Sequence, residues 1–455
     1  MNKKEGQIHS LKAVRRRLTI AILAAGCCLS LGFLGYLVFY LPPAALSAAS
    51  YPAPAGNPAN IARMDFTDEA VITNTPESSR IQAGANPTGK PEALPDSRLD
   101  HNPLNLADLL DITPQSTVSY LSGPSTCITR VSGGLVTELR NIFAGLPGPG
   151  SNAMQAPAEA QMAAWENLVR LMAAGDIGSA CKLIRESHFP YQVWDFTDIP
   201  NASEPYWMLV EKQPLTVGWG TYVFRRQGPY SELVVEIPHI EADSYTEMQG
   251  IDIFRQGRAR ALLVAGTHRC ANSSYSACTG LTMACGKLEP YRTSDVGHAT
   301  QTMFQAAHRA LVPCGGSRVA LQLHGNSLAG CPDAFISNGT LYPHRLSTKL
   351  TGSIARRCSS FSVDLADNQP SSGGKPECAF TSGTSVQAVY SNGCSPNSQV
   401  DACNAYINQV PEPETFLSVE QSLNLRQDGE CLVKAIKDTF PIKDEFNGLE
   451  DRGNR

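Results

Sequence analysis

An uncharged apolar run near the N-terminus limits what the chain can fold into. Residues 18–41 read LTIAILAAGCCLSLGFLGYLVFYL, 24 residues without a charge. At about 1.5 Å per residue, this run can cross a bilayer core of roughly 30 Å. Residues 1–17 hold six Lys and Arg but only one acid. By the positive-inside rule, a basic segment of this kind stays in the cytoplasm. The sequence therefore predicts a single-pass anchor in the lipid bilayer, a cytoplasmic tail of residues 1–17, and an extracytoplasmic C-terminal part.

A cleaved signal peptide is the main alternative to this anchor, because Ser47, Ala48 and Ala49 could form a small-residue cleavage site. The apolar region of a signal peptide is normally about 7–15 residues, shorter than this run. Lipid attachment at Cys27 is a further alternative, but the chain stays apolar for 14 more residues. An uncleaved signal-anchor is therefore favoured.

The rest of the chain divides by composition into a tether, a folded domain and a tail. Residues 42–103 contain ten Pro and no sustained apolar period, which predicts a flexible linker. Residues 104–440 carry regular apolar periods and are expected to form one extracytoplasmic α/β domain. The charged residues 441–455 are expected to fray.

Cysteine usage agrees with export from the cytoplasm. Twelve of the 14 Cys lie outside the apolar run, an even number in a compartment where disulfides persist. The alternative is structural zinc, which needs closely paired Cys, and these twelve contain no C-x-x-C. Up to six disulfides are expected, in pairings that the sequence does not assign. The Gly-, Ser-, Asn- and Cys-rich residues 327–413 are interpreted as a disulfide-held insertion.

The charge balance excludes one class of partner. The chain has 37 Lys and Arg against 42 Asp and Glu, a net charge of −5. Since residues 1–17 contribute +5, the remainder carries −10. Nucleic-acid binding requires a basic surface, so no nucleic acid is expected as a partner.

Hydrophobic periods predict a helical layer followed by an α/β sheet. Residues 158–188 form an amphipathic helix with an interruption at Gly175 and Asp176. Later segments alternate between strand and helix patterns, which is typical of a mostly parallel sheet with helices on both faces. The expected strands are 206–210, 220–224, 233–237, 261–265, 318–323 and 415–420, and the expected helices are 243–256, 295–312 and 429–440.

Polar side chains follow several of these strands. In an open parallel sheet, ligands bind at the carboxyl ends of the strands. His239 follows one strand and His324 another, and imidazole with carboxylate is a ligand set for zinc. The third ligand would be an acid after His239, and Asp243 at the start of the next helix is slightly favoured over Glu247. Glu241 ranks third.

Other polar residues near these strand ends have alternative interpretations. Arg269 could form a salt bridge or bind substrate, and Asp295 is expected first as a helix N-cap. His298 could reach the site from the start of that helix. His308 is expected to be structural.

Six short motifs resemble those of a known family. They are Gly-Trp-Gly at 218–220, V-V-E-I-P-H with D-x-x-T-E within 234–247, A-G-T-H-R at 265–269, S-D-V-G-H at 294–298, Q-L-H-G-N at 322–326 and V-E-Q-S-L-N-L-R at 419–426. Together they resemble zinc-dependent amide hydrolases on the carboxypeptidase-like phosphorylase/hydrolase fold, with poly-γ-glutamate hydrolases and N-formylglutamate amidohydrolases nearest. The usual H-x-x-E of carboxypeptidases and the H-G-G of poly-γ-glutamate hydrolases are missing.

The resemblance implies a function and a role for each site residue. It implies that His239, His324 and either Asp243 or Glu247 bind Zn²⁺, with Glu420 as the catalytic acid. Arg269 or Arg426 would bind a substrate carboxylate. The expected function is a membrane-anchored, extracytoplasmic zinc hydrolase of amide bonds in peptide-like or acyl-amino-acid substrates. A cell-wall muramoyl-L-alanine amidase and a noncatalytic binding module on a stalk are the alternatives.

Overall fold

The computed structural model of the chain describes residues 117–119 and 127–442, apart from residues 202, 229, 367–377, 379, 395–400, 406 and 408–412. The predicted cytoplasmic tail, membrane anchor and linker all lie outside the described residues. So does the C-terminal tail from residue 443 onward. Within the described part, no helix is both long enough and apolar enough to cross a membrane.

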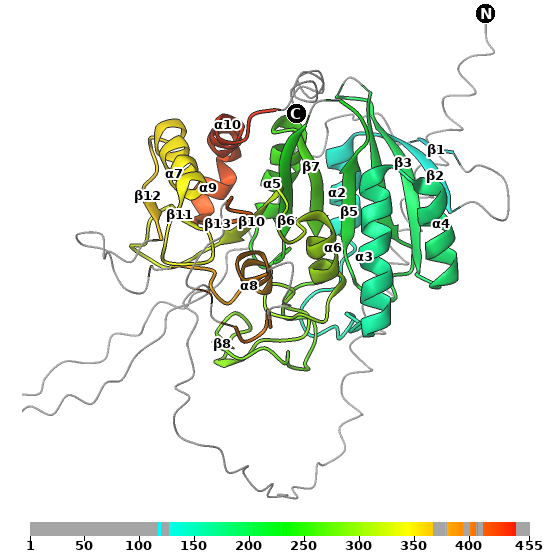
Figure 1. Ribbon diagram of the computed structural model, residues 1–455, viewed down its shortest axis with the longest axis horizontal. Coiled ribbons are helices and arrows are strands. Elements are labelled where there is room, and N and C mark those ends of the chain that lie inside the picture. The colour runs from blue at the N-terminus through cyan, green and yellow to red at the C-terminus, as the bar shows by residue number, and fades with distance from the viewer. Residues whose placement is uncertain are drawn as a thin grey trace, which may run out of the picture. The chain divides into compact units, whose positions relative to one another are not determined.

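One large sheet organises the described chain (Figure 1). Its strands are β1 (Thr117–Ser119), β2 (Ile128–Gly133), β3 (Tyr191–Asp198), β4 (Glu204–Glu211), β5 (Thr221–Arg225), β6 (Ser231–Ile237), β7 (Ala259–Val264), β10 (Val319–Gly325), β11 (Ala334–Ser337), β12 (Val363–Leu365) and β13 (Phe416–Gln421). They are ordered β1-β2-β3-β4-β5-β7-β6-β10-β13-β11-β12. The short strands β8 (Leu281–Thr282) and β9 (Glu289–Pro290) pair separately.

The centre of the sheet is parallel. Strands β7, β6, β10 and β13 all run in the same direction, and β4 and β5 run antiparallel to both of their neighbours. Strand β11 runs antiparallel to β13 and parallel to β12. Each of the six expected strands coincides with one of the observed ones. The α/β prediction is therefore confirmed, with antiparallel strands added on both sides of the parallel centre.

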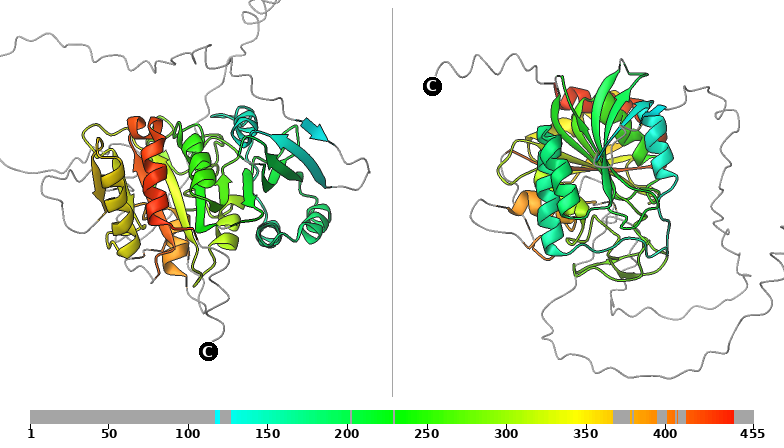
Figure 2. Two further views of the ribbon diagram at one scale, coloured as in Figure 1. Left: turned by 90° about the horizontal axis from the view of Figure 1, so that it is seen from above. Right: turned by 90° about the vertical axis from the view of Figure 1, so that its right-hand side faces the viewer.

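Helices cover both faces of this sheet. They are α2 (Leu135–Phe143), α3 (Glu159–Ala174), α4 (Ile177–Glu186), α5 (Thr246–Gln256), α6 (Met303–Leu311), α7 (Arg345–Arg357), α8 (Val386–Gly393), α9 (Leu423–Gln427) and α10 (Gly429–Thr439). Helix α6 contacts α3 and α8, whereas α10 contacts α5 and α7. The end-on view in Figure 2 shows the twisted sheet between these two helical layers.

The predicted break in the N-terminal helical segment is confirmed. Gly175 ends α3 in the left-handed conformation with φ 77°, which glycine adopts without a Cβ penalty. Asp176 then caps α4 by accepting a hydrogen bond from the Ser179 backbone N–H. The fully buried Trp165 anchors α3 to the sheet through edge contacts with Tyr191 and Tyr222.

Two expected helices begin later than the sequence pattern predicts. Helix α5 begins at Thr246 after Tyr245, and α6 begins at Met303 after Thr302. Asp243 and Asp295 are therefore not N-caps. The physical reason is that both carboxylates contact the imidazole of His239 in place of backbone N–H groups.

Six disulfides join all twelve cysteines of the described chain. The pairs are Cys127–Cys181, Cys270–Cys285, Cys278–Cys403, Cys314–Cys394, Cys331–Cys378 and Cys358–Cys431. The expected disulfide framework is therefore confirmed. Residues 327–413 also supply β11, β12, α7 and α8, so this cysteine-rich segment is partly built into the main sheet.

Candidate metal centre

The candidate site lies where the direction of the strand order reverses. From β6 the chain passes through α5 to β7 on one side, and then through α6 to β10 on the other side of β6. Ligands bind at such switch points, beside the carboxyl ends of the strands. His239 lies two residues after β6, and His324 is the second-to-last residue of β10.

Three side chains converge at this switch point. His239 Nδ1 lies 3.2 Å from Asp243 Oδ2 and 3.1 Å from His324 Nδ1. The third side of the triangle, from His324 Nδ1 to Asp243 Oδ2, is 3.7 Å. Neighbouring ligand atoms of a tetrahedral zinc with bonds of about 2.0–2.1 Å lie roughly 3.3–3.4 Å apart. His239, Asp243 and His324 therefore have the spacing of a zinc ligand set.

The hydrogen bonds behind both rings allow the converging atoms to act as acceptors. His239 Nε2 faces Asp295 Oδ1 at 3.1 Å, and His324 Nε2 faces Gln322 Oε1 at 3.2 Å. Because the amide oxygen of Gln322 only accepts hydrogen bonds, we assign the ring proton of neutral His324 to Nε2. His239 faces a carboxylate with each ring nitrogen, so a metal ion on Nδ1 would leave its ring proton on Nε2, directed at Asp295. In that protonation state both Nδ1 lone pairs point toward Asp243, and the three converging acceptor atoms suit a cation between them.

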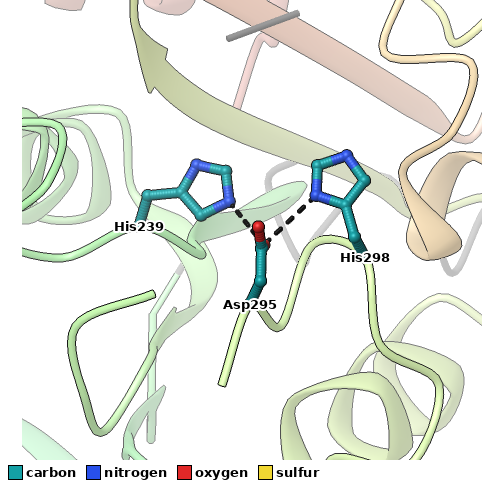
Figure 3. Close-up of side chains that lie close together, drawn as sticks. All are labelled: His239, Asp295 and His298. Carbon is teal, nitrogen blue, oxygen red and sulfur yellow. Dashed lines mark hydrogen bonds and ion pairs between the residues drawn. The ribbon is translucent and has the colours of Figure 1, made fainter. Parts of the chain in front are cut away.

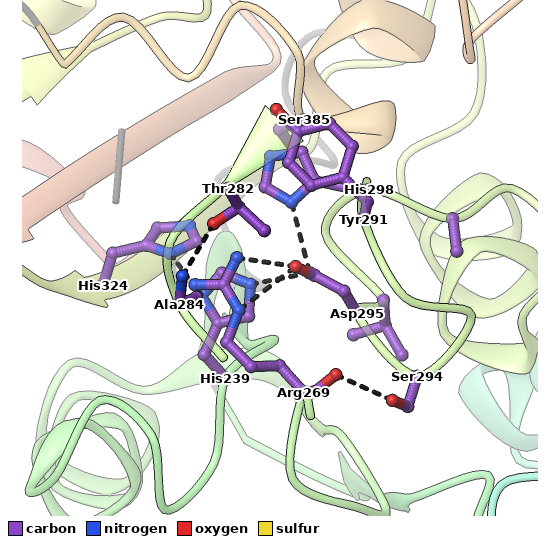
Figure 4. Close-up of polar contacts among 12 residues, drawn as sticks. His239, Arg269, Thr282, Ala284, Tyr291, Ser294, Asp295, His298, His324 and Ser385 are labelled. Carbon is purple, nitrogen blue, oxygen red and sulfur yellow. Dashed lines mark hydrogen bonds and ion pairs between the residues drawn. The ribbon is translucent and has the colours of Figure 1, made fainter. Parts of the chain in front are cut away.

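Asp295 holds His239 from behind (Figure 3). Its Oδ1 also accepts from His298 Nδ1 at 3.2 Å, and its Oδ2 accepts from Arg269 Nε and Nη2 at 3.1 and 2.6 Å. Figure 4 shows the Arg269 side chain directed at Asp295. His239, Asp295 and His298 have a metal-ligand spacing of their own. However, the buried guanidinium of Arg269 already balances the charge of Asp295. We therefore interpret Asp295 and His298 as residues that support His239 from behind, and not as a second metal site.

Electrostatics keep the two aspartates ionised. Burial would raise the pKa of Asp243, but the adjacent His239 and His324 rings hold it well below its usual value. Burial also opposes ionisation of Asp295, and the charge of Arg269 lowers its pKa well below normal. Burial and Arg269 lower the pKa of His239, whereas Asp295 and Asp243 raise it, and the net shift is upward. The site thus favours a positive charge at its centre.

Close backbone packing positions the loop that carries Arg269. A Cβ on Gly266 would lie 2.3 Å from Gly220 N and 2.6 Å from the Gly218 carbonyl. Gly220 itself has φ 107°. The Gly-Trp-Gly and A-G-T-H-R motifs therefore supply glycines where the two chain segments touch. This contact fixes the start of the loop that ends at Arg269.

A pocket of about 120 Å³ opens beside the candidate metal centre. Asp243 and two arginines, Arg269 and Arg426, form part of its wall. The other lining residues are Ala242, Ala284, Gly325, Asn326, Ser327, Leu328 and Phe380. Among the described residues, Arg426 Nε and Asn326 Nδ2 are buried donors without a hydrogen-bond partner. The pocket therefore offers donor groups to an anionic or carbonyl-containing ligand.

The remaining predicted site residues occupy distinct places. Glu420 lies in β13 directly beside His324 in the parallel register and is only 1% exposed. Glu247 lies in the first turn of α5, outside both candidate metal groups, where burial raises its pKa and the charge of Arg426 opposes that shift. Glu241 is exposed on the preceding loop. His308 is fully buried between Glu236 and Ser391, as expected for a structural histidine.

Sequence reasoning missed the supporting residues. Asp295 was expected as an N-cap, and neither Gln322 nor Asn326 was assigned a role. The D-x-x-H spacing of Asp295 and His298 is the available signal, since it places both side chains on one turn. Gln322 has a comparable signal, because strand alternation puts it on the same side of β10 as His324.

Comparison with known proteins gives structural similarities only. No protein-family model matches the chain, and no curated protein matches it. It is similar to N-formylglutamate amidohydrolase from Ralstonia eutropha, with 12% identity, a TM-score of 0.26, and 49% of this chain and 94% of the other covered. It is also similar to a metallo-carboxypeptidase from Burkholderia cenocepacia, with 11% identity, a TM-score of 0.28, and coverages of 63% and 69%.

Proposed function

We propose that this chain is a zinc-dependent hydrolase of amide bonds in peptide-like or acyl-amino-acid substrates. The observation that carries the proposal is the convergence of His239 Nδ1, His324 Nδ1 and Asp243 Oδ2 within 3.1–3.7 Å of one another. The adjoining pocket supplies a place for substrate. Three protein ligands with an open side are typical of catalytic zinc sites.

Each residue of the site would have one task. His239, Asp243 and His324 would hold the ion, which when bound supplies Lewis-acid catalysis and acidifies water. Glu420 would take a proton from the attacking water and pass it to the leaving amine. Arg426 is better placed than Arg269 to bind a substrate carboxylate, since two N–H groups of Arg269 already donate to Asp295.

We propose further that the chain is anchored in a membrane by residues 18–41 and that its catalytic part lies outside the cytoplasm. The uncharged run with its preceding basic residues supports the anchor. Six disulfides support the oxidising side of the membrane. Partners would then be the lipid bilayer and a peptide-like or acyl-amino-acid substrate.

Metal content tests the proposal most directly. The full-length chain, purified without chelator, should contain one zinc per chain by mass spectrometry. His239→Ala and His324→Ala should each lose most of this metal, because each variant leaves only two protein ligands. His188→Asn is the matched control, since His188 is exposed and lies outside the site. A wild-type chain without stoichiometric metal would favour the noncatalytic binding module.

A substrate panel separates the enzymatic alternatives. The zinc-loaded chain should be assayed on γ-glutamyl peptides, N-acyl amino acids and muramoyl peptides from the cell wall. We expect cleavage of the first two classes. Cleavage restricted to muramoyl peptides would instead identify the cell-wall amidase.

A further inference from the structure

A buried polar row extends from the candidate ligand His324 into the core. Glu236 in β6 lies opposite Gln322 in β10, in the register of the parallel pair. Glu236, Gln322 and His308 are all 0% exposed. Helices α6 and α8 supply the rest of the row through His308, Gln387 and Ser391. Glu236, Gln387 and Ser391 have no task in the candidate metal centre itself.

The two oxygens of Glu236 have different partners. Oε1 lies 2.8 Å from His308 Nδ1, and Oε2 accepts from Gln322 Nε2 at 3.0 Å. Because a carboxylate only accepts hydrogen bonds, the amide nitrogen of Gln322 must be the atom that faces it. The same nitrogen donates to Gln387 Oε1 at 3.0 Å. That oxygen is fixed in turn, because Gln387 Nε2 donates to the Val296 carbonyl at 3.0 Å.

The fixed amide of Gln322 then determines which nitrogen of His324 carries the proton. Its oxygen Oε1 faces His324 Nε2 at 3.2 Å and also accepts from Ser385 Oγ at 3.3 Å. An amide oxygen cannot donate, so Nε2 of the neutral ring must carry the hydrogen. His324 Nδ1 is left with its lone pair directed at His239 Nδ1 and Asp243.

We propose that Glu236 is a positioning residue that sets the tautomer of His324 through Gln322. Glu236 touches no candidate ligand in any contact described above, yet its acceptor character orients the amide that orients the imidazole. The part of the inference that concerns metal affinity rests on the proposed function, whereas the tautomer does not. Hydrogen-bonded partners behind metal-binding histidines commonly change affinity by about 10- to 100-fold.

A nucleophilic triad is the competing interpretation of the same residues. Ser391 Oγ lies 2.9 Å from His308 Nε2, and His308 Nδ1 lies 2.8 Å from Glu236, which are the spacings of a Ser–His–Glu triad. However, Ser391 is only 4% exposed, on the helix whose other side chains fill this row. We therefore interpret His308, held by Ser391, as the structural hydrogen-bond partner of Glu236 Oε1.

The tautomer can be measured in metal-free protein. In the full-length chain with ¹⁵N-labelled histidine, treated with chelator, the His324 ring should give NMR shifts of a single Nε2–H tautomer. The His324→Ala variant assigns this signal. In Glu236→Gln the new amide can present either nitrogen or oxygen to Gln322, so the His324 signal should shift toward a mixture of tautomers. Zinc affinity should fall about 10- to 100-fold.

Two further variants separate positioning from general damage. Glu414→Gln is the matched control, because Glu414 is also a buried carboxylate, hydrogen-bonded to Asn338 and Ser347 outside this row. It should leave the His324 signal and zinc affinity unchanged. The double variant Glu236→Gln with Gln322→Glu should restore the Nε2–H signal, since the carboxylate at 322 accepts from His324.

Each outcome decides the inference. An Nδ1–H tautomer of His324 in the metal-free wild type would overturn it, even if Glu236→Gln did not fold. An unshifted His324 signal in Glu236→Gln would overturn it as well, as would labelling of Ser391 by a fluorophosphonate. A shifted tautomer in a chain that binds no zinc would support the positioning role and contradict the proposed function instead.

Discussion

Glu420 and His324 are neighbours across two parallel strands, but we propose different roles for them. His324 points a ring nitrogen at His239 and Asp243, whereas Glu420 belongs to neither candidate metal group. We expect Glu420→Gln to retain zinc and to lower turnover by about 10²–10⁴-fold, the usual loss for a general base. Parallel metal analysis and amidase assays check this. Loss of zinc in Glu420→Gln would instead make Glu420 a ligand.

Proton competition at His239 gives a pH prediction. The pKa of His239 is raised above 6.5, because Asp295 and Asp243 outweigh the lowering by burial and Arg269. A protonated ring cannot bind metal, so zinc affinity should be highest above this raised pKa and fall as the pH drops through it. The fall should begin above pH 6.5 and reach about tenfold per pH unit for one displaced proton. Affinity measured from pH 5.5 to 8.5 that showed no such fall would contradict it.

At the scale of residues, the sequence predicts the side chains at the ends of strands. It misses the side chains that tertiary contacts bring to the site. His239 and His324 were predictable because each follows an apolar strand pattern. The sequence left the choice of acid open, and our proposal takes Asp243, because its carboxylate lies near both rings. Asp295 contacts His239 across 56 residues, so no local pattern reports that pairing.

At the scale of elements, a glycine contact between loops carries a prediction. Gly266→Ala would place a Cβ against the backbone of Gly218 and Gly220. Backbone atoms cannot move out of the way as easily as the end of a flexible side chain. We expect a loss of about 1–3 kcal/mol or more in unfolding free energy, and weaker zinc binding as Arg269 shifts. Gly148→Ala is the control, because nothing lies within 4 Å of its Cβ position and its effect should stay within about 0.5 kcal/mol. Equal denaturation midpoints for the two variants would contradict this.

The Cys358–Cys431 disulfide gives a second prediction at this scale. It joins the end of α7 to α10, across 73 residues of chain. Replacing both cysteines by Ala should lower the unfolding free energy by about 2–5 kcal/mol, because the unfolded chain gains freedom. Zinc content should stay the same, since neither helix carries a proposed ligand. Denaturant unfolding with metal analysis checks both points, and loss of zinc from the folded variant would contradict the second.

Element boundaries were predictable only where local chemistry decides them. Gly175 and Asp176 mark the break between α3 and α4, and both signals are in the sequence. The start of α6 was not predictable from Asp295, because that side chain is used by the site. Thr302 caps the helix seven residues later.

At the scale of the whole molecule, the parallel centre was predictable and the edge beyond β13 was not. Apolar runs such as 233–237 and 261–265 identify buried strands by themselves. Strand β11 is only four residues long, and it is defined by its antiparallel pairing with β13. A strand of this length has no sequence period, so residues 327–413 were interpreted as an insertion. Its pairing with the strand that carries Glu420 places part of this segment beside the site.

The number of free thiols tests the proposed location of the whole chain. Of 14 cysteines, twelve form disulfides in the described residues, and Cys27 and Cys28 lie in the proposed anchor. If the domain is extracytoplasmic, alkylation of denatured full-length chain taken directly from cells should modify two thiols without reductant and all 14 after reduction. Mass spectrometry counts the modified cysteines. The control is the same chain expressed without residues 1–41, which should stay in the reducing cytoplasm with its twelve remaining cysteines as thiols. Fourteen thiols in the unreduced full-length chain would place the domain in the cytoplasm, because six disulfides do not persist there.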